Sequence, residues 1–363
     1  MSKRITFISH GSKQLGMGHV MRCCSLAEAF QQNGWEVFFF SKFYLGGMWI
    51  KQKGFPVEIF EKEESKKECQ DFHFGEVKEL EPDINWMSPF LKEQNPDVIF
   101  LDSYNVNFWF FQKLKEFTKC LVYLDDLAVW DYPVDVIFNP NVDAGEKGYA
   151  QFRRQKKHLL GSKYSLLREE FSNLPKRKAK KEIQNILITT GAADPKNMTK
   201  VFLDLCQKMC PKAVCHLIIG NAFQRQEEWK KEESHNVRIY QSPKTMSEIM
   251  LQCDVAISAG GSTVYELAAC GVPTLAFLYS ENQKGVVEYL SEREYLVNIG
   301  NYESIKQRNK EILEHFFMQW NEMMSQEKRQ IMIEKQQSLF DGGGTKRVAK
   351  EIEKCYLSTF GKL

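Results

Sequence analysis

The feature that most constrains the fold is an alternation of short apolar runs with amphipathic stretches, which runs through both halves of the chain. It predicts parallel β-sheets covered by helices, because consecutive parallel strands need a helical crossover between them. Several runs are continuously apolar, as strands are when both faces of a sheet are covered. The predicted strands are Ile5–Ser9, Glu36–Ser41, Val57–Phe60, Asp97–Leu101, Leu121–Leu124, Val134–Phe138, Ile186–Thr190, Val214–Ile219, Val237–Tyr240, Val255–Ser258 and Thr274–Phe277.

A chain of 363 residues is long for a single core, so we expect two α/β domains of Rossmann-like type. The expected division is an N-terminal domain over 1–175, a C-terminal domain over 182–340 and a C-terminal helix within 341–363. The charged run Pro175–Lys181 has no interleaved aromatic residues, so we interpret it as a solvated linker rather than a nucleic-acid-binding patch. The expected helices are Val20–Asn33, one around Leu166–Phe171, a long one over Ile305–Ser338, and Thr345–Tyr356.

Composition excludes several classes of function. A net charge of +2 gives no general attraction to nucleic acid or to an anionic membrane. No apolar run is long enough to span a bilayer, and the N-terminus does not resemble a signal peptide, so we expect a cytoplasmic protein with reduced cysteines. Cys206, Cys210, Cys215 and His216 could be zinc ligands, but without a CxxC pair we expect buried thiols, and no metal or cofactor. The sequence does not fix the oligomeric state, and a monomer is compatible with it.

Two similar α/β halves predict a ligand cleft between them at the carboxyl ends of the strands. Gly16-Met17-Gly18-His19 follows the first predicted strand and precedes the first helix. Gly16 and Gly18 would let the loop turn tightly near a ligand, and His19 could take a proton near neutral pH. The alternative interpretation is a glycine-rich turn whose histidine caps the helix.

A second glycine loop, Ser258-Ala259-Gly260-Gly261-Ser262-Thr263, lies between a predicted strand and a helix. Its glycines would allow a diphosphate to approach the backbone, and the hydroxyls of Ser262 and Thr263 add donors. Glu266 lies one turn further, where a carboxylate could bind the ribose hydroxyls. The alternative is that Thr263 and Glu266 form a capping box with a structural role only.

Three further strand ends carry polar residues. Asp102 and Tyr104 follow an apolar strand at alternating positions, so they would face the same side if the strand continued. Asp125-Asp126 ends the next strand, and acids on consecutive strands suggest a polar floor to the cleft. In the second half, the amides of Asn282 and Gln283 could bind sugar or phosphate oxygens, or mark a helix start.

Together these motifs resemble the family of UDP-2,4-diacetamido-2,4,6-trideoxy-β-L-altropyranose hydrolases of pseudaminic acid biosynthesis and the related spore-coat polysaccharide proteins. The resemblance covers nearly the whole chain. Its motifs are GMGHVMRCCSLAEAF (16–30), LDSY (101–104), LDDLA (124–128), VIFNPNVDA (136–144), LLGSKYSLLREEF (159–171), SAGGSTVYELAACGVP (258–273), ENQ (281–283) and DGGGTKRVAKEI (341–352).

The resemblance implies a two-domain GT-B-type fold similar to that of the MurG-type glycosyltransferases. It implies UDP bound through the Gly260–Glu266 segment, and metal-independent, inverting hydrolysis of the sugar–UDP bond. The family's water-activating histidine maps onto His19, its strand-end tyrosine onto Tyr104, and the asparagine of its N-Q pair onto Asn282.

The chain departs from the family pattern at two places. The strand-end motif usually reads D-H-Y, but position 103 is Ser103; a G-G-x-D junction reads Gly191-Ala192-Ala193-Asp194. Ala192 would crowd a backbone approach that glycine allows, and Ser103 removes a possible imidazole, which leaves the exact sugar open. Two rival functions stay open as well: an inverting UDP-sugar glycosyltransferase, and a nucleotide-sugar-binding protein without turnover.

Overall fold

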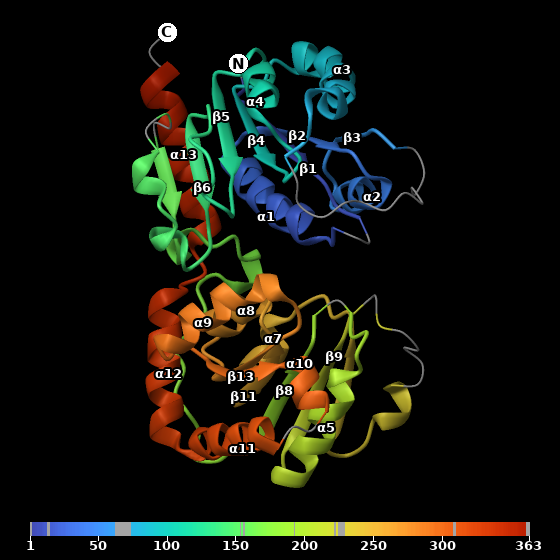
Figure 1. Ribbon diagram of the computed structural model, residues 1–363, viewed down its shortest axis with the longest axis vertical. Coiled ribbons are helices and arrows are strands. Elements are labelled where there is room, and N and C mark those ends of the chain that lie inside the picture. Colours follow the sequence, from blue (N-terminus) through green and yellow to red (C-terminus); the bar gives the residue numbers. More distant parts are fainter. Residues whose placement is uncertain are drawn as a thin grey trace. The chain divides into compact units, whose positions relative to one another are not determined.

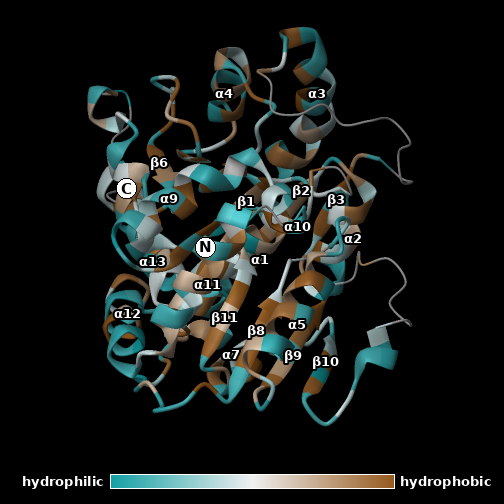
Figure 2. Cartoon of the chain, turned by 60° about the horizontal axis from the view of Figure 1, so that its bottom comes forward, coloured by the Kyte–Doolittle hydropathy of each residue, from teal (hydrophilic) through white to brown (hydrophobic). Residues whose placement is uncertain are grey.

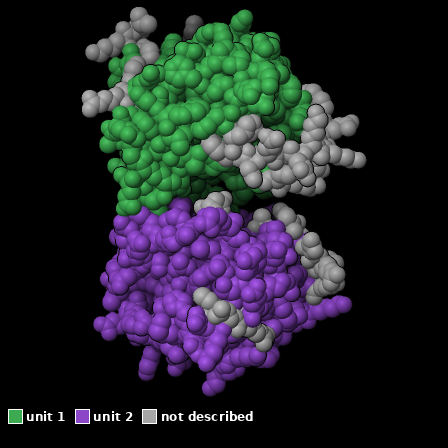
Figure 3. All heavy atoms as spheres, viewed as in Figure 1, with its two compact units in different colours: residues 1–168, 343–363 green, residues 169–342 purple. Residues whose placement is uncertain are grey.

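The computed structural model describes residues 2–12, 15–61, 74–152, 154, 157–191, 193–220, 223, 229–307 and 310–360. The chain forms two compact units (Figure 3): unit 1 consists of residues 1–168 and 343–363, and unit 2 of residues 169–342. The expected division placed the boundary at 175–182 and treated 341–363 as a separate helix. In the structure the chain crosses between the units near residue 168, and the last helix belongs to unit 1.

Unit 1 is built on a seven-stranded sheet in the order β3-β2-β1-β4-β5-β6-β7, with every neighbouring pair parallel. The inner strands β1 and β4 are buried because helices cover both faces of the sheet. The strands of unit 1 are β1 Arg4–Ser9, β2 Glu36–Ser41, β3 Val57–Ile59, β4 Val98–Asp102, β5 Cys120–Leu124, β6 Val136–Asn139 and β7 Lys157–Leu160.

Side chains that alternate along these strands form two separate cores. Phe7, Phe39 and Phe100 point to the face covered by helices α1 and α13, whereas Ile8, Phe40 and Leu101 point to the face covered by α3 and α4 (Figure 1). The helices of unit 1 are α1 Gly18–Gln32, α2 Tyr44–Gln52, α3 Val77–Gln94, α4 Phe108–Lys115 and α13 Gly344–Phe360.

Unit 2 has a six-stranded parallel sheet in the order β10-β9-β8-β11-β12-β13. Apolar residues run along β8, β9 and β11 (Figure 2), and helices α5, α10 and α11 pack against one face of the sheet. The elements of unit 2 are β8 Asn185–Thr189, α5 Met198–Met209, β9 Val214–Ile219, β10 Val237–Gln241, α7 Ser247–Gln252, β11 Val255–Ala259, α8 Thr263–Ala269, β12 Thr274–Leu278, α9 Lys284–Glu292, β13 Val297–Asn301, α10 Tyr302–Lys306, α11 Lys310–Met324 and α12 Gln326–Leu339.

Eleven strands lie where the sequence predicts them, and two further strands were not predicted. Both of these, β7 and β13, are edge strands of their sheets and are only half-buried along most of their length. An edge strand contacts one neighbouring strand only, so its sequence does not need the apolar run that marks a central strand.

The prediction of helices after residue 165 was partly wrong. Only Glu169–Phe171 forms a short 3₁₀ turn, although Leu167 and Phe171 are buried at helical spacing. The long helix expected over 305–338 is interrupted at Ser325, whose hydroxyl accepts a bond from the Lys328 N–H and starts α12 anew.

The run Pro175–Lys181 is mostly exposed, as expected, but it does not link the units, because it lies within unit 2 and packs on it through Ala179 and Arg177. Ala179 is buried, and its N–H donates to Gln330 Oε1 at 2.8 Å. Arg177 donates to the backbone oxygens of Met250 and Cys253 at the end of α7, where unpaired carbonyls attract a cation. The cysteines Cys206 and Cys215 lie in the apolar core of unit 2, as expected of buried thiols.

Candidate functional site

The loop between β1 and α1 brings the first glycine motif to the carboxyl end of the unit 1 sheet. Gly16 has a φ of +77°, a conformation that other residues rarely adopt, and it pairs with Ser12 across the turn. No described atom lies within 4 Å of a Cβ added at Gly18, so packing does not explain that glycine. The residue in the cap position of α1 is Met17, and His19 is the second residue of the helix.

His19 pairs with Asp102, the last residue of β4. Its Nδ1 lies 2.7 Å from Asp102 Oδ1. We assign a proton to Nδ1, because a carboxylate can only accept. In neutral His19 the lone pair is then on Nε2, which has no hydrogen-bond partner among the described residues. The His19 side chain is 13% exposed and that of Asp102 is 1% exposed, so a buried acid orients an imidazole that solvent can reach.

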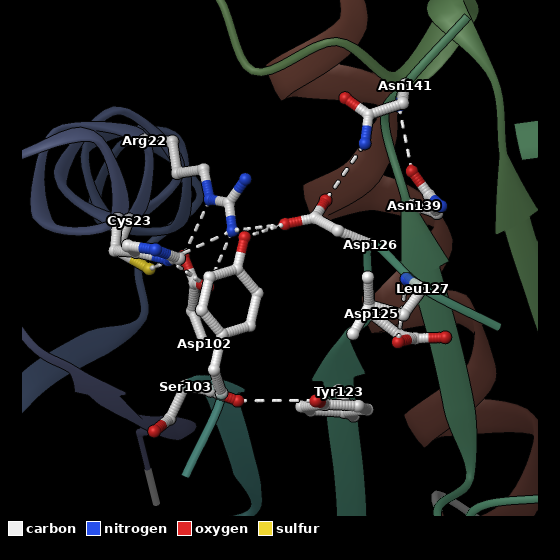
Figure 4. Close-up of polar contacts among 12 residues, drawn as sticks. Arg22, Cys23, Asp102, Ser103, Tyr123, Asp125, Asp126, Leu127, Asn139 and Asn141 are labelled. Carbon is white, nitrogen blue, oxygen red and sulfur yellow. Dashed lines mark hydrogen bonds and ion pairs between the residues drawn. The ribbon is translucent and has the colours of Figure 1, made fainter. Parts of the chain in front are cut away.

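Arg22, one helical turn after His19, holds the same carboxylate. Its Nε and Nη2 donate to the two oxygens of Asp102, each at 2.7 Å (Figure 4). Nη2 also donates to Asp126 Oδ2 at 3.3 Å. Burial alone would raise the pKa of the Asp102 carboxyl, but the charges and hydrogen bonds of Arg22 and His19 hold it well below its usual range. Asp102 is therefore ionised at neutral pH.

Tyr104 follows β4 and contacts Asp126, which follows the neighbouring strand β5. Its hydroxyl donates to Asp126 Oδ2 at 2.8 Å, and its ring meets the ring of His19 edge-on at 4.9 Å. Burial and the Asp126 carboxylate raise the pKa of Tyr104, which keeps its proton. The amide of Asn141 donates to the other oxygen of Asp126 at 3.0 Å (Figure 4). Asp102 and Tyr104 thus reach the same polar group, which we call the His19 cluster: His19, Arg22, Asp102, Tyr104, Asp126 and Asn141.

Arg22 has none of the roles predicted from the motifs, and Asp126 was predicted only as an acid at a strand end. The signal for Arg22 was its spacing of three from His19, which places both side chains on one face of a helix. A third unassigned residue, His10, follows β1 and accepts from the Lys42 N–H at 3.1 Å through Nδ1. Burial, with the charges of Lys42 and His19, lowers the pKa of His10 to about 3.

The second glycine loop follows β11 in unit 2. A Cβ added at Gly260 would lie 2.3 Å from Val287 Cγ2, so the close packing against Val287 requires a glycine here. At Gly261 the nearest described atom would be 3.9 Å away, and Ser262 is exposed. The capping box proposed for Thr263 and Glu266 is not formed, because α8 begins at Thr263 and Ser262 takes the cap position without a side-chain bond.

The structure describes only some of the remaining residues that were predicted to line the site in unit 2. Gln283 accepts from the Tyr279 N–H at 2.9 Å and so holds the turn after β12. Gly191 has a φ of +94°. The side chain of Asn282 and the whole of Ala192 lie outside the described residues. Ser103, in unit 1, is buried, and its carbonyl accepts from the Tyr123 hydroxyl at 3.2 Å (Figure 4).

Two other features are absent from the residues that the structure describes. No group of three or more His, Cys, Asp and Glu side chains among them could hold a metal ion. None of the described helices combines the length and apolar character needed to cross a membrane.

The family described as "Glycosyl transferases group 1" matches residues 170–337. An uncharacterized protein of Methanocaldococcus jannaschii, MJ1062, is 28% identical over 77% of this chain and 57% of its own length. The spore coat polysaccharide biosynthesis protein SpsG of Bacillus subtilis is 24% identical over 54% of this chain and 56% of its own length. The chain thus matches just over half the length of each of these two relatives.

The UDP-2,4-diacetamido-2,4,6-trideoxy-β-L-altropyranose hydrolase of Campylobacter jejuni is 22% identical over 81% of this chain and 98% of its own length. Among solved structures, MurG of Acinetobacter baumannii superposes with a TM-score of 0.66 at 14% identity, over 97% of this chain and 99% of its own. The chain therefore has a GT-B-type α/β fold of two Rossmann-like parallel-sheet domains, and its sequence is similar to that of a nucleotide-sugar hydrolase.

Proposed function

We propose that the chain hydrolyses a UDP-linked amino-deoxy sugar of the 2,4-diacetamido-2,4,6-trideoxy-β-L-altropyranose type to free sugar and UDP. The observation that carries this proposal is the pairing of His19 Nδ1 with the buried Asp102 carboxylate at 2.7 Å, because it fits His19 Nε2 to take a proton. The similarity to the Campylobacter hydrolase supports the same activity. The reaction would serve nonulosonic (pseudaminic) acid or surface-polysaccharide biosynthesis in the cytoplasm.

In the proposed reaction, His19 Nε2 takes a proton from a water molecule while the water oxygen bonds to the anomeric carbon. The bond from that carbon to the diphosphate oxygen breaks on the opposite face, and its electron pair leaves with UDP. The anomeric configuration is therefore inverted. Asp102 stabilises the imidazolium that forms, and Tyr104 orients the sugar or the water. UDP is a good leaving group, so the mechanism uses neither a metal ion nor a dedicated acid.

The diphosphate is assigned to the loop after β11. The open backbone at Gly261 and the hydroxyls of Ser262 and Thr263 would bind its oxygens, and Glu266 would bind the ribose. The role of Gly260 is revised: it allows the loop to pack against Val287 rather than to contact UDP.

The first test is incubation of the protein with UDP-sugars in the absence of any acceptor, with UDP release as the readout. The proposal predicts UDP release and a free sugar whose anomer, followed by NMR, is inverted. Replacing His19 with Ala should lower turnover by about 10²–10⁴-fold while UDP still binds. Turnover at the wild-type rate by H19A would remove His19 from the mechanism.

A second candidate, an inverting glycosyltransferase, is favoured by the match of residues 170–337 to the glycosyltransferase family. In that case His19 would deprotonate an acceptor hydroxyl instead of water. Strict dependence of UDP release on an added acceptor would favour this candidate. Binding of UDP without release of sugar from any donor would favour a non-catalytic binding protein.

A further inference from the structure

Arg22 has two N–H groups for which the described residues provide no acceptor. A guanidinium carries five N–H donors. The Nε donor and the two Nη2 donors bind Asp102 and Asp126. The two Nη1 donors have no acceptor among the described residues, and the Arg22 side chain is 22% exposed. Figure 4 shows that this nitrogen points away from both carboxylates.

The charges around Arg22 disfavour an anionic ligand at Nη1. One guanidinium faces two carboxylates, Asp102 and Asp126, so with neutral His19 the cluster carries a net charge of about −1 at neutral pH. The nearby Lys147 ammonium contacts the Asp126 backbone oxygen, but its own charge is matched by Asp143 at 3.2 Å. A phosphate oxygen would be repelled here, whereas a neutral oxygen would accept from Nη1 without that cost.

The position of Arg22 indicates that its ligand is the sugar part of the substrate rather than the diphosphate. Its Nη2 lies 3.1 Å from His19 Nδ1, so the guanidinium stands beside the imidazole that the proposed mechanism sets against the anomeric carbon. An acyl carbonyl accepts hydrogen bonds through two lone pairs in the plane of the amide, a geometry suited to a guanidinium donor. A sugar hydroxyl, in contrast, can also act as a donor and has no such fixed direction.

We infer that Arg22 Nη1 donates to the carbonyl oxygen of an N-acyl group on the substrate sugar and so makes the site select N-acylated amino sugars. This inference rests on the proposed function, which places the sugar of the substrate beside the His19 cluster. Arg22 is fixed by Asp102 and Asp126 before the sugar arrives, so little conformational freedom is lost on binding.

The test compares three probes, UDP, UDP-glucose and UDP-N-acetylglucosamine, by calorimetric titration. The two sugar nucleotides differ at one position, hydroxyl against acetamido. The wild-type protein should bind the N-acetyl sugar about tenfold or more tightly than UDP-glucose, as expected for a hydrogen bond from a charged donor. In R22K, which keeps the charge but has no Nη1, the two affinities should become equal, and the affinity for UDP should not change.

Arg154→Lys is the matched control, because Arg154 is an exposed arginine of unit 1 that pairs with Asp131 and should leave all three affinities unchanged. Thermal unfolding confirms that each variant is folded, and R22Q replaces R22K if the latter is not. Equal wild-type affinities for the two sugars would overturn the inference, and that comparison needs no variant. An equal loss of affinity for UDP and both sugars in R22K would do so too, because it would mark Arg22 as a phosphate ligand or a structural residue.

Binding and turnover are measured separately, so the two proposals can fail separately. A protein that prefers the N-acetyl sugar through Arg22 but releases no UDP keeps the inference and loses the hydrolase. A protein that releases UDP but shows no preference for the N-acetyl sugar keeps the hydrolase and loses the inference.

Discussion

His19 Nδ1 and Asp102 Oδ1 lie 2.7 Å apart, which links the second residue of α1 to the last residue of β4. Both residues sit on regular elements of unit 1, so the position of the imidazole is fixed by the sheet and its covering helix rather than by a loop alone. The pairing also sets which ring nitrogen is available to a ligand, since Nδ1 is taken.

Replacing Asp102 with Asn should lower turnover far more than it lowers affinity for UDP. An amide can place its N–H toward His19 Nδ1 and favour the wrong tautomer, and it cannot stabilise an imidazolium. The change also removes the buried partner of Arg22, which should cost about 3 kcal/mol of unfolding free energy. Steady-state kinetics and denaturant unfolding measure the two effects.

Glu116→Gln is the control for the stability effect, because Glu116 pairs with Lys113 on an exposed surface of the same unit. It should change the unfolding free energy by less than about 0.5 kcal/mol. An Asp102→Asn variant with wild-type kcat would contradict the role assigned to the His19–Asp102 pair.

The two glycines of the second loop should respond differently to alanine. Gly260→Ala places a methyl group 2.3 Å from Val287 Cγ2 and should destabilise unit 2 by about 1–3 kcal/mol. Val287→Ala in the same chain should restore part of that loss, because it removes the clashing methyl groups. Thermal unfolding of the single and double variants checks both expectations.

Gly261→Ala meets open space and should leave the unfolding temperature nearly unchanged. If the proposed diphosphate site is correct, its added methyl group should weaken UDP binding, which titration calorimetry measures. A Gly261→Ala variant that binds UDP as tightly as the wild type would exclude a close approach of the diphosphate at this backbone.

The free energy of unfolding should decrease as the pH is lowered from 7 to 5, and we expect His10 to cause part of this decrease. The pKa of His10 is lowered to about 3 in the fold, from an ordinary value of 6.5, by burial and by the charges of Lys42 and His19. As pH falls from 7 to 5, the unfolded chain therefore takes up a proton that the folded chain does not, and the free energy of unfolding decreases. Asp102, whose pKa is depressed, contributes stability that is constant over this range and is lost only at much lower pH.

His10→Asn isolates this effect, because the Asn side-chain oxygen can still accept from the Lys42 N–H. Between pH 7 and 5 the variant should lose about 2 kcal/mol less stability than the wild type, as measured by urea unfolding at each pH. Equal losses in the two proteins would show that folding does not lower the pKa of His10.

The sequence predicted most of the fold because its central strands are covered on both faces and must be apolar. The inner strands β1, β2, β4, β5, β6, β8, β9, β11 and β12 are of this kind. The edge strands β3 and β10 are only partly buried, yet their short apolar runs were still recognised, whereas the edge strands β7 and β13 carry polar residues such as Lys157 and Asn298. The failure around Leu166–Phe171 has a different origin, since two buried residues four apart are compatible with either a helix or a tight turn.

The candidate site was predictable in part for a related reason. Asp102 and Tyr104 follow a predicted strand and His19 precedes a predicted helix, so their approach follows from topology alone. The contacts of Arg22 with two acids depend on side-chain conformations that spacing does not fix. The packing of Gly260 against Val287 depends on the position of α9, which no local pattern specifies.

Hydrolysis of the UDP-linked diacetamido sugar in H₂¹⁸O by the wild-type protein and by H19Q tests whether water activated at His19 attacks the anomeric carbon. Mass spectrometry then locates the label in the two products. We predict ¹⁸O on the anomeric carbon of the sugar, unlabelled UDP, and a turnover at least about 10²-fold lower in H19Q. Label in the diphosphate, or the same turnover in both proteins, would contradict attack at the anomeric carbon by water activated at His19.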